Sequence, residues 1–172
     1  SNFEEDFIKI KKLGEKIRKE NIKIPYIPDF LFNGLISKVK DSLYGFVIGD
    51  ALGVPVEFMS REELIKNPVT SMLGYGTHNV EEGVWSDDTS MTLATIDSII
   101  NCNGLNYNDM MNNFLMWYGK YKYTATNKVF DIGRTTYDAL LDYAENKKNP
   151  VECGLKGIND NGNGSLMRML PI

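Results

Sequence analysis

The sequence contains very few of the side chains that build imidazole or thiolate centres. It has one histidine, His78, and two cysteines, Cys102 and Cys153, among 172 residues. A single histidine excludes a metal site built mainly from imidazoles, and the cysteine spacing matches neither a zinc site nor a redox pair. We therefore interpret His78, which lies in a glycine-rich loop, as a surface residue, and we expect a reducing, cytoplasmic environment.

Long apolar runs and a basic surface are also missing. No apolar stretch approaches the roughly 18 residues of a membrane span, and no signal peptide is recognisable. The formal net charge is −4, and the basic residues cluster only near the start, where acidic residues are interleaved with them. This mixing is typical of a solvated helix face, so we expect neither a membrane nor a nucleic acid as partner.

Strand signals are absent too, whereas helical spacing of apolar residues is frequent. The spacing predicts domain helices at about residues 34–51, 87–101 and 108–119, another after 131–136, and a short helix at 61–66. The methionine and aromatic stripe of residues 108–119 indicates a core face rather than a cofactor site. Gly45 and Gly49 indicate close approach of another backbone, and Gly53 before Pro55 predicts a left-handed helix end.

The N-terminal segment differs from the rest of the chain. Apolar residues recur at helical spacing over residues 3–20, and Pro25 and Pro28 then favour extended backbone. We expect residues 1–32 to form an N-terminal helix and a proline-containing arm. Residues 33–172 would form the domain, with Asn33 capping its first helix.

The stretch Ser86-Asp87-Asp88-Thr89 stands directly before an apolar helical run. Two adjacent carboxylates repel each other, and a hard cation such as Mg²⁺, Mn²⁺ or Ca²⁺ between them would offset that repulsion. The alternative is a helix start in which Ser86 is the N-cap and the two acids interact with the helix dipole. The stretch alone leaves both interpretations open.

A second polar segment, Asn159 to Arg168, alternates glycine and asparagine before an apolar stretch. Such a segment can align backbone N–H groups at a helix N-terminus and bind phosphate, or it can be a plain turn. Asp50 and Glu57, at the end of the first domain helix and in the turn after it, could equally be solvated or capping acids.

Four motifs occur together in one order. They are G-x3-G-D-A-L-G-x-P-x-E (Gly45 to Glu57), W-S-D-D-T-S-M (Trp85 to Met91), D-I-G-x-T-T (Asp131 to Thr136) and G-N-G-S-L-M-R (Gly162 to Arg168). Their identity and order resemble the ADP-ribosylglycohydrolase family, which includes the dinitrogenase reductase-activating glycohydrolases. The resemblance covers residues 34–172 and leaves the N-terminal arm outside.

The resemblance implies an all-α, multi-helix fold with a dinuclear Mg²⁺ or Mn²⁺ site. The implied reaction is hydrolysis of an N- or O-glycosidic bond that joins ADP-ribose to a protein or small-molecule acceptor. By the same resemblance, the metal ligands map onto Ser86, Asp87 and Asp88. Glu57 would contribute to catalysis, Asp131 would face the substrate, and the diphosphate would be held by Gly162, Asn163, Gly164 and Ser165.

The family also supplies late Asp and Thr metal ligands from a D-x-D-T type motif, which is not found up to Ile172. We therefore expect an apparently truncated domain. It would be a fragment, or half of a site that a C-terminal polypeptide completes, or a non-catalytic module. Such a module would bind ADP-ribose or neutralise an ADP-ribosylating toxin with its N-terminal arm. The 172-residue chain alone should bind Mg²⁺ weakly and hydrolyse nothing, because half a ligand set leaves most coordination positions to water.

Asparagine substitution separates the two interpretations of the Asp-Asp pair. Asp87→Asn and Asp88→Asn keep the side-chain size and a capping oxygen, so a purely structural cap should lose less than about 1 kcal/mol of folding stability. Metal ligands should instead lose hydrolytic activity by orders of magnitude while the melting temperature is retained. Wild-type rates in both variants, measured on the full-length protein, would contradict a metal role.

Overall fold

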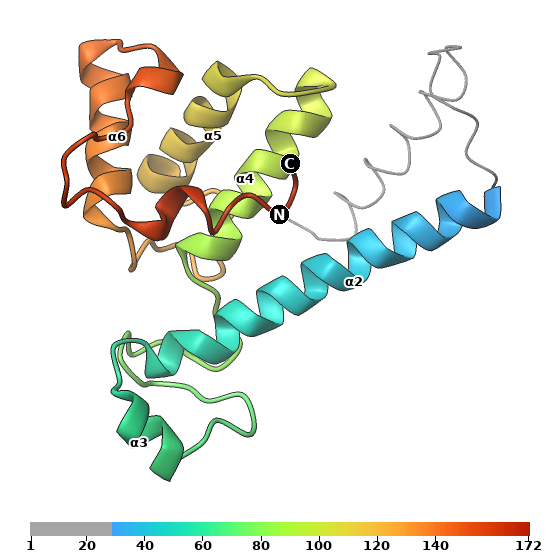
Figure 1. The fold of residues 1–172 in the computed structure, drawn as a ribbon, viewed down its shortest axis with the longest axis vertical. Coiled ribbons are helices and arrows are strands. Elements are labelled where there is room, and N and C mark those ends of the chain that lie inside the picture. The colour runs from blue at the N-terminus through green and yellow to red at the C-terminus, as the bar shows by residue number, and fades with distance from the viewer. Residues whose placement is uncertain (1–28) are drawn as a thin grey trace.

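The computed structural model describes residues 29–172, so the expected helix of residues 3–20 and most of the proline-containing arm lie outside the described part (Figure 1). The chain forms five α-helices and three short 3-10 helices in that range: α2 (Asp29–Gly53), η1 (Val54–Val56), α3 (Arg61–Lys66), α4 (Asp87–Cys102), α5 (Tyr107–Lys120), α6 (Arg134–Asn146), η2 (Pro150–Glu152) and η3 (Asn163–Ser165). Residues 29–172 contain no strand, which confirms the expected all-α class. Their helices include none long and apolar enough to cross a membrane.

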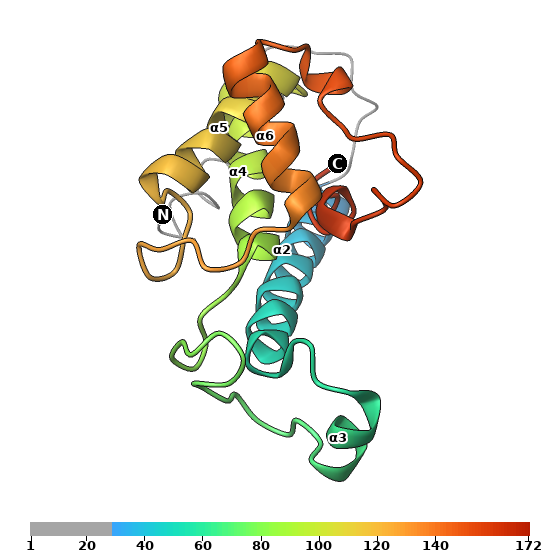
Figure 2. The ribbon, with the colours of Figure 1, turned by 90° about the vertical axis from the view of Figure 1, so that its left-hand side faces the viewer.

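Helix α4 lies at the centre of the packed core. Helices α4, α5 and α6 lie together as one group, and the long helix α2 leaves that group at an angle (Figures 1 and 2). The predicted stripe of α5 is buried, with Trp117 only 1% exposed, and it packs on the apolar residues of α4. The core cluster consists of Met91, Leu93, Ala94, Met110, Met111, Phe114, Trp117, Tyr123, Leu140 and Cys153.

Many of the buried residues of α4 carry hydroxyl groups rather than aliphatic side chains. Thr89, Thr92 and Thr95 are at most 1% exposed, and Ser90 is 2% exposed. The hydroxyl of Ser90 donates to the carbonyl of Ser86 at 2.8 Å, and that of Thr95 donates to the carbonyl of Met91 at 2.9 Å. A buried hydroxyl is costly without a partner, and these bonds within one helix supply the partner. The core can therefore accept small polar residues here.

Helix α2 differs from its prediction at both ends. It begins at Asp29, directly after the second proline of the arm, so Asn33 lies inside the helix and is not its cap. The predicted left-handed conformation of Gly53 is wrong. Its backbone is right-handed (φ −77°), because the chain continues into η1, and the first left-handed residue after α2 is Phe58 (φ 64°). Pro55 fits η1 because a proline is well tolerated in a first helical turn.

The two glycines of α2 do not mark a close contact among the described residues. A Cβ atom added to Gly45 or Gly49 would have no heavy atom within 4 Å, so the predicted close approach is wrong for residues 29–172. The same helix leaves Leu35, Val39 and Ile48 between 40% and 50% exposed. Its apolar stripe is therefore only partly covered by the rest of the described chain.

The long connection between α2 and α4 contains the expected short helix α3 and an irregular loop. Ser60 begins α3 with a capping box, in which its hydroxyl accepts from the backbone of Glu63 and the Glu63 carboxylate accepts from the backbone of Ser60. Farther along, the backbone of Gly76 passes against the Pro55 carbonyl, where a Cβ atom would overlap the Pro55 backbone. The backbone of Thr77 donates to the same carbonyl at 2.9 Å. The loop is thereby attached to the turn after α2.

This attachment makes a prediction about Gly76. Alanine there should lower the free energy of unfolding by about 1–3 kcal/mol, because the clash is with backbone that cannot rotate away. For a chain of this length the melting temperature should fall by several degrees.

Gly45→Ala is the matched control, since its Cβ atom meets open space in an exposed helix. It should raise stability by up to about 1 kcal/mol. Equal melting temperatures for the two variants, measured by circular dichroism, would contradict the close approach at Gly76.

Candidate functional site

Asp50, in the last turn of α2, accepts hydrogen bonds from the first turn of α4. Its carboxylate receives the backbone N–H of Ser86 at 3.1 Å and the Ser86 hydroxyl at 2.7 Å. It also receives the backbone N–H of Thr89 at 3.1 Å and the Thr89 hydroxyl at 2.6 Å. A carboxylate at this position satisfies helix N–H groups and favours the positive end of the helix dipole. Asp50 therefore joins the end of α2 to the start of α4.

Ser86 is the N-cap of α4, as one of the two interpretations predicted. Its hydroxyl oxygen accepts the backbone N–H of Asp88 at 3.2 Å while its hydrogen is donated to Asp50. A hydroxyl oxygen has two lone pairs, so the cap occupies one of them and the second stays available to a ligand. Capping and metal binding by Ser86 are thus compatible.

Asp87 and Asp88 lie in the first turn of α4, in a strongly acidic environment. Asp87 is only 7% exposed, and burial, followed by the charges of Asp131, Asp88 and Asp50, raises its pKa to about 8. Burial and the charge of Asp50 also raise the pKa of Asp88 above its ordinary value. Ionised carboxylates are destabilised here unless a positive charge lies between them.

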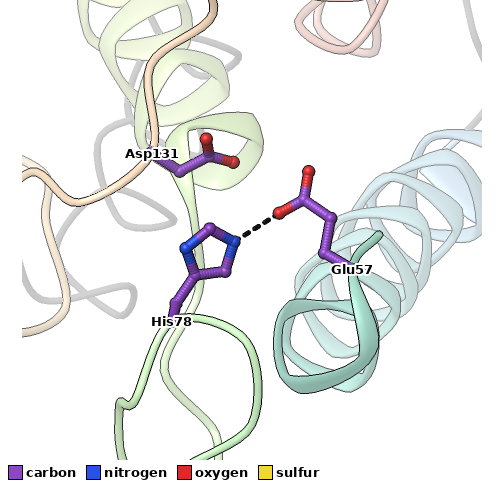
Figure 3. Close-up of side chains that lie close together, drawn as sticks. All are labelled: Glu57, His78 and Asp131. Atoms are coloured by element: carbon purple, nitrogen blue, oxygen red, sulfur yellow. Dashed lines mark hydrogen bonds and ion pairs between the residues drawn. The ribbon is translucent and has the colours of Figure 1, made fainter. Parts of the chain in front are cut away.

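A second group of side chains consists of Glu57, His78 and Asp131, which converge from three separate segments (Figure 3). Each offers one ligand atom, and these atoms lie within 4.8 Å of one another. His78 Nε2 is 2.5 Å from Glu57 Oε2, and the His78 side chain is 12% exposed. The prediction that His78 is a surface residue is therefore wrong, because the attached loop turns the imidazole inward toward Glu57.

Asp131 connects this group to the acids of α4. Burial and the charge of Glu57 raise the pKa of Asp131, and the charge of His78 opposes that rise. Asp131 is also the nearby acid that contributes most to the raised pKa of Asp87. The predicted metal ligands and the two predicted catalytic acids thus occupy one continuous acidic site at the start of α4.

The donor set fits a divalent cation. Carboxylate and hydroxyl oxygens are preferred by Mg²⁺ and Mn²⁺, and an imidazole is accepted by Mn²⁺ as well. A cation would also remove the repulsion that raises the pKa values of Asp87, Asp88 and Asp131. Both Ser86-Asp87-Asp88 and the Glu57, His78 and Asp131 group could contribute ligands to such an ion.

The glycine loop lies beside the start of α6. Its 3-10 turn η3 is followed by further turns and not by an α-helix up to residue 172, so of the two open interpretations the structure favours the turn. The loop packs on α6. A Cβ atom added to Gly162 would lie 2.7 Å from the Thr135 hydroxyl oxygen, and a Cβ atom added to Gly164 would overlap the Thr136 hydroxyl oxygen. Both glycines are needed for this close contact.

Arg168 links the glycine loop to the acidic site, a role that the motif did not reveal. Its guanidinium donates to the carbonyl of Gly164 and lies 4.9 Å from the ring centre of Phe114. Burial lowers the pKa of Arg168, and the negative charge of Asp87 opposes that change. A buried arginine beside an acidic cluster supplies part of the compensating charge.

The sequence reasoning therefore missed two partners, His78 and Arg168, and found Asp50 only as an acid of open role. The contacts of all three join segments far apart in the chain, and no local spacing signals such contacts. His78 is a single histidine in a glycine-rich loop, and no pattern of neighbouring residues indicates a binding or catalytic role for it.

Comparison with known proteins identifies the family of this chain. A family model described as ADP-ribosylglycohydrolase matches residues 33–172. Two curated relatives, each named ADP-ribosylarginine hydrolase Tri1, come from Serratia proteamaculans and Pseudomonas putida. They are 33% and 32% identical over 79% of this chain, which corresponds to 36% and 35% of their own lengths.

A third relative, the ADP-ribosyl-[dinitrogen reductase] glycohydrolase of Rhodospirillum rubrum, is 30% identical over 74% of this chain and 40% of its own length. A solved structure described as an ADP-ribosylglycohydrolase-related protein complex superposes with a TM-score of 0.59 at 33% identity. That match covers 75% of this chain and 39% of the solved one. The chain thus spans little more than a third of the length of its curated relatives. With the family model matched from residue 33 to residue 172, the chain belongs to the ADP-ribosylglycohydrolase family.

Proposed function

We propose that the protein acts in the metal-dependent hydrolysis of the N-glycosidic bond between ADP-ribose and an arginine side chain of a protein. Two of the relatives are named for ADP-ribosylarginine, and the third is named for an ADP-ribosylated protein. The observation that carries the proposal is the buried carboxylate of Asp87 among Asp88, Asp131 and Asp50, because such a cluster favours binding of a cation.

In this proposal Ser86, Asp87 and Asp88 provide metal ligands from the first turn of α4. When bound, Mg²⁺ or Mn²⁺ supplies positive charge that holds the ribose hydroxyls and makes nearby water more acidic. The hydroxyl of Ser86 is fixed by its bond to Asp50, which directs its remaining lone pair. Two ions, as in the complete family site, would draw on the neighbouring carboxylates as well.

In this proposal Glu57 and Asp131 orient the attacking water and transfer protons. Cleavage at the anomeric carbon of ribose passes through an oxocarbenium-like transition state, and a carboxylate can orient and deprotonate the attacking water. Burial raises the pKa of Asp131, so its carboxyl group holds a proton more readily than that of an ordinary aspartate. The backbone N–H groups of Gly162, Asn163, Gly164 and Ser165 would donate to the diphosphate, whose charge they offset.

Release of ADP-ribose from an ADP-ribosylarginine protein tests the proposal in the full-length protein. Turnover should need MgCl₂ or MnCl₂ and stop in EDTA. Asp131→Asn should lower kcat by about 100-fold or more, as expected for loss of an acid–base group. Asp142→Asn is the matched control, since Asp142 lies on α6 and pairs with Lys148 instead. It should leave kcat unchanged.

Turnover that persists in EDTA would contradict metal dependence. Binding of ADP-ribose without any turnover would favour a non-catalytic module of the same fold. Faster release from ADP-ribosylserine than from ADP-ribosylarginine would contradict the arginine acceptor.

The stability of the metal-free chain should depend on pH through Asp87. Its pKa is about 8 in the folded chain and 3.8 as a reference, so between these values the folded state binds more protons than the unfolded state. The free energy of unfolding should therefore fall as pH rises from about 5 to 8, by at most ~1.4 kcal/mol per pH unit for one proton. Melting curves in EDTA across this range measure the slope.

In the full-length protein, addition of MgCl₂ or MnCl₂ should remove most of that decline, since the cation replaces the proton. Asp87→Asn in EDTA should flatten the curve, whereas Asp142→Asn should not. A melting temperature that rises from pH 5 to 8 in EDTA would mean that Asp87 is not the dominant titrating group.

A further inference from the structure

The imidazole of His78 is held in place by its own loop. The hydroxyl of Thr77 donates to the carbonyl of Glu57 at 2.7 Å, and the backbone of Thr77 donates to the carbonyl of Pro55 at 2.9 Å. Within the loop, the backbone of Tyr75 donates to the carbonyl of Val80 at 2.6 Å. These bonds attach the residue before His78 to the same turn that carries Glu57. The distance between the imidazole and the carboxylate is thereby set by backbone contacts.

Two phenylalanine rings flank the imidazole. The ring centre of Phe130 is 5.2 Å away and that of Phe58 is 6.2 Å away, both tilted relative to His78. Phe58 directly follows Glu57, and Phe130 directly precedes Asp131. The imidazole therefore lies close to the neighbours of both acids. Phe130 is the nearer ring, and its packing limits rotation of the imidazole.

The imidazole and the Glu57 carboxylate form one short contact, with His78 Nε2 2.5 Å from Glu57 Oε2. A carboxylate oxygen accepts hydrogen bonds, so the role proposed below requires that Nε2 carries the proton. A nitrogen that carries this proton has no lone pair for a metal ion. The bond occupies one oxygen of Glu57 and leaves Oε1 for another partner.

We propose that His78 is a positioning residue that orients the Glu57 carboxylate, so that Oε1 points toward the substrate side of the acidic site. The role rests on the proposed function only in requiring that Glu57 takes part in the reaction. In this role Nε2 of His78 binds Glu57 and not a metal ion, although the ring lies in the acidic site.

The experiment compares two substitutions of the single histidine. His78→Gln keeps an N–H donor near the position of Nε2, whereas His78→Phe keeps an aromatic ring without a donor. Loss of a residue that orients a reacting group costs about 10- to 100-fold. We expect that loss in kcat for His78→Phe, with KM changed less than about 3-fold, and recovery to within about 3-fold of wild type for His78→Gln.

A double variant separates this proposal from the proposed function. If His78 acts through Glu57, Glu57→Gln combined with His78→Phe should be no slower than Glu57→Gln alone. A wild-type rate for Glu57→Gln would overturn the role of Glu57 itself. A slow Glu57→Gln variant together with a wild-type rate for His78→Phe would overturn only the positioning role.

Two further measurements do not depend on turnover. In a long-range ¹H–¹⁵N spectrum of the full-length protein, the imidazole signals that disappear in His78→Phe belong to His78. Their proton should lie on Nε2, and they should move in Glu57→Gln. The Mn²⁺ concentration that half-saturates the protein should change less than about 3-fold in His78→Phe, because in this role the imidazole binds Glu57 and not the ion. An Nε2 without a proton, or Mn²⁺ binding weakened tenfold or more, would assign His78 as a metal ligand and overturn the proposal.

Discussion

The structure depends on one interaction between elements, the bond network between the Asp50 carboxylate and the first turn of α4. Four donors converge on this single acid, from the backbones and hydroxyls of Ser86 and Thr89. The network satisfies N–H groups that the start of a helix leaves unpaired, and it does so with a negative charge that the helix dipole favours. It also fixes the direction in which Asp87 and Asp88 leave the helix.

Helix α4 therefore has two different roles along its length. Its first turn faces other carboxylates and contributes to the acidic site, whereas the following turns pack on α5 in the core. The packing of the later turns provides the stability that offsets repulsion at the first turn, because buried apolar area and close contacts favour the folded state. Site and core are thus connected through one helix rather than through a loop.

The helices of the domain could be predicted because apolar periodicity is a local property of the chain. Residues 61–66 form a helix as predicted, and the predicted helices at 87–101 and 108–119 differ by one residue at their ends from α4 and α5. The predicted start of α2 at Asn33 was wrong, because asparagine can either cap a helix or lie inside one. The predicted left-handed end at Gly53 was wrong, because the chain continues there in a right-handed 3-10 turn.

Only part of the candidate site could be predicted from the sequence. The motifs singled out Glu57, Asp87, Asp88 and Asp131, and their raised pKa values or close packing place them in one acidic site, whereas their individual roles remain proposals. The inward position of His78 depends on the contact between Gly76 and Pro55, which joins residues about twenty positions apart. Contacts of this range depend on how loops fold back on helices, and a single sequence has no periodic signal for them.

The buried hydroxyls of α4 have a consequence for how this domain can change over evolutionary time. Ser90, Thr92 and Thr95 are small and almost fully enclosed, so volume rather than hydropathy limits what can replace them. Exchanges among serine, threonine and alanine change that volume only slightly, whereas leucine or phenylalanine would push neighbouring helices apart. The polar residues of α4 give it a low hydropathy, although the helix is mostly buried. The substitutions that it tolerates should therefore be those of a tightly packed core. Distant relatives should therefore be easier to detect by side-chain size along this helix than by its hydrophobicity.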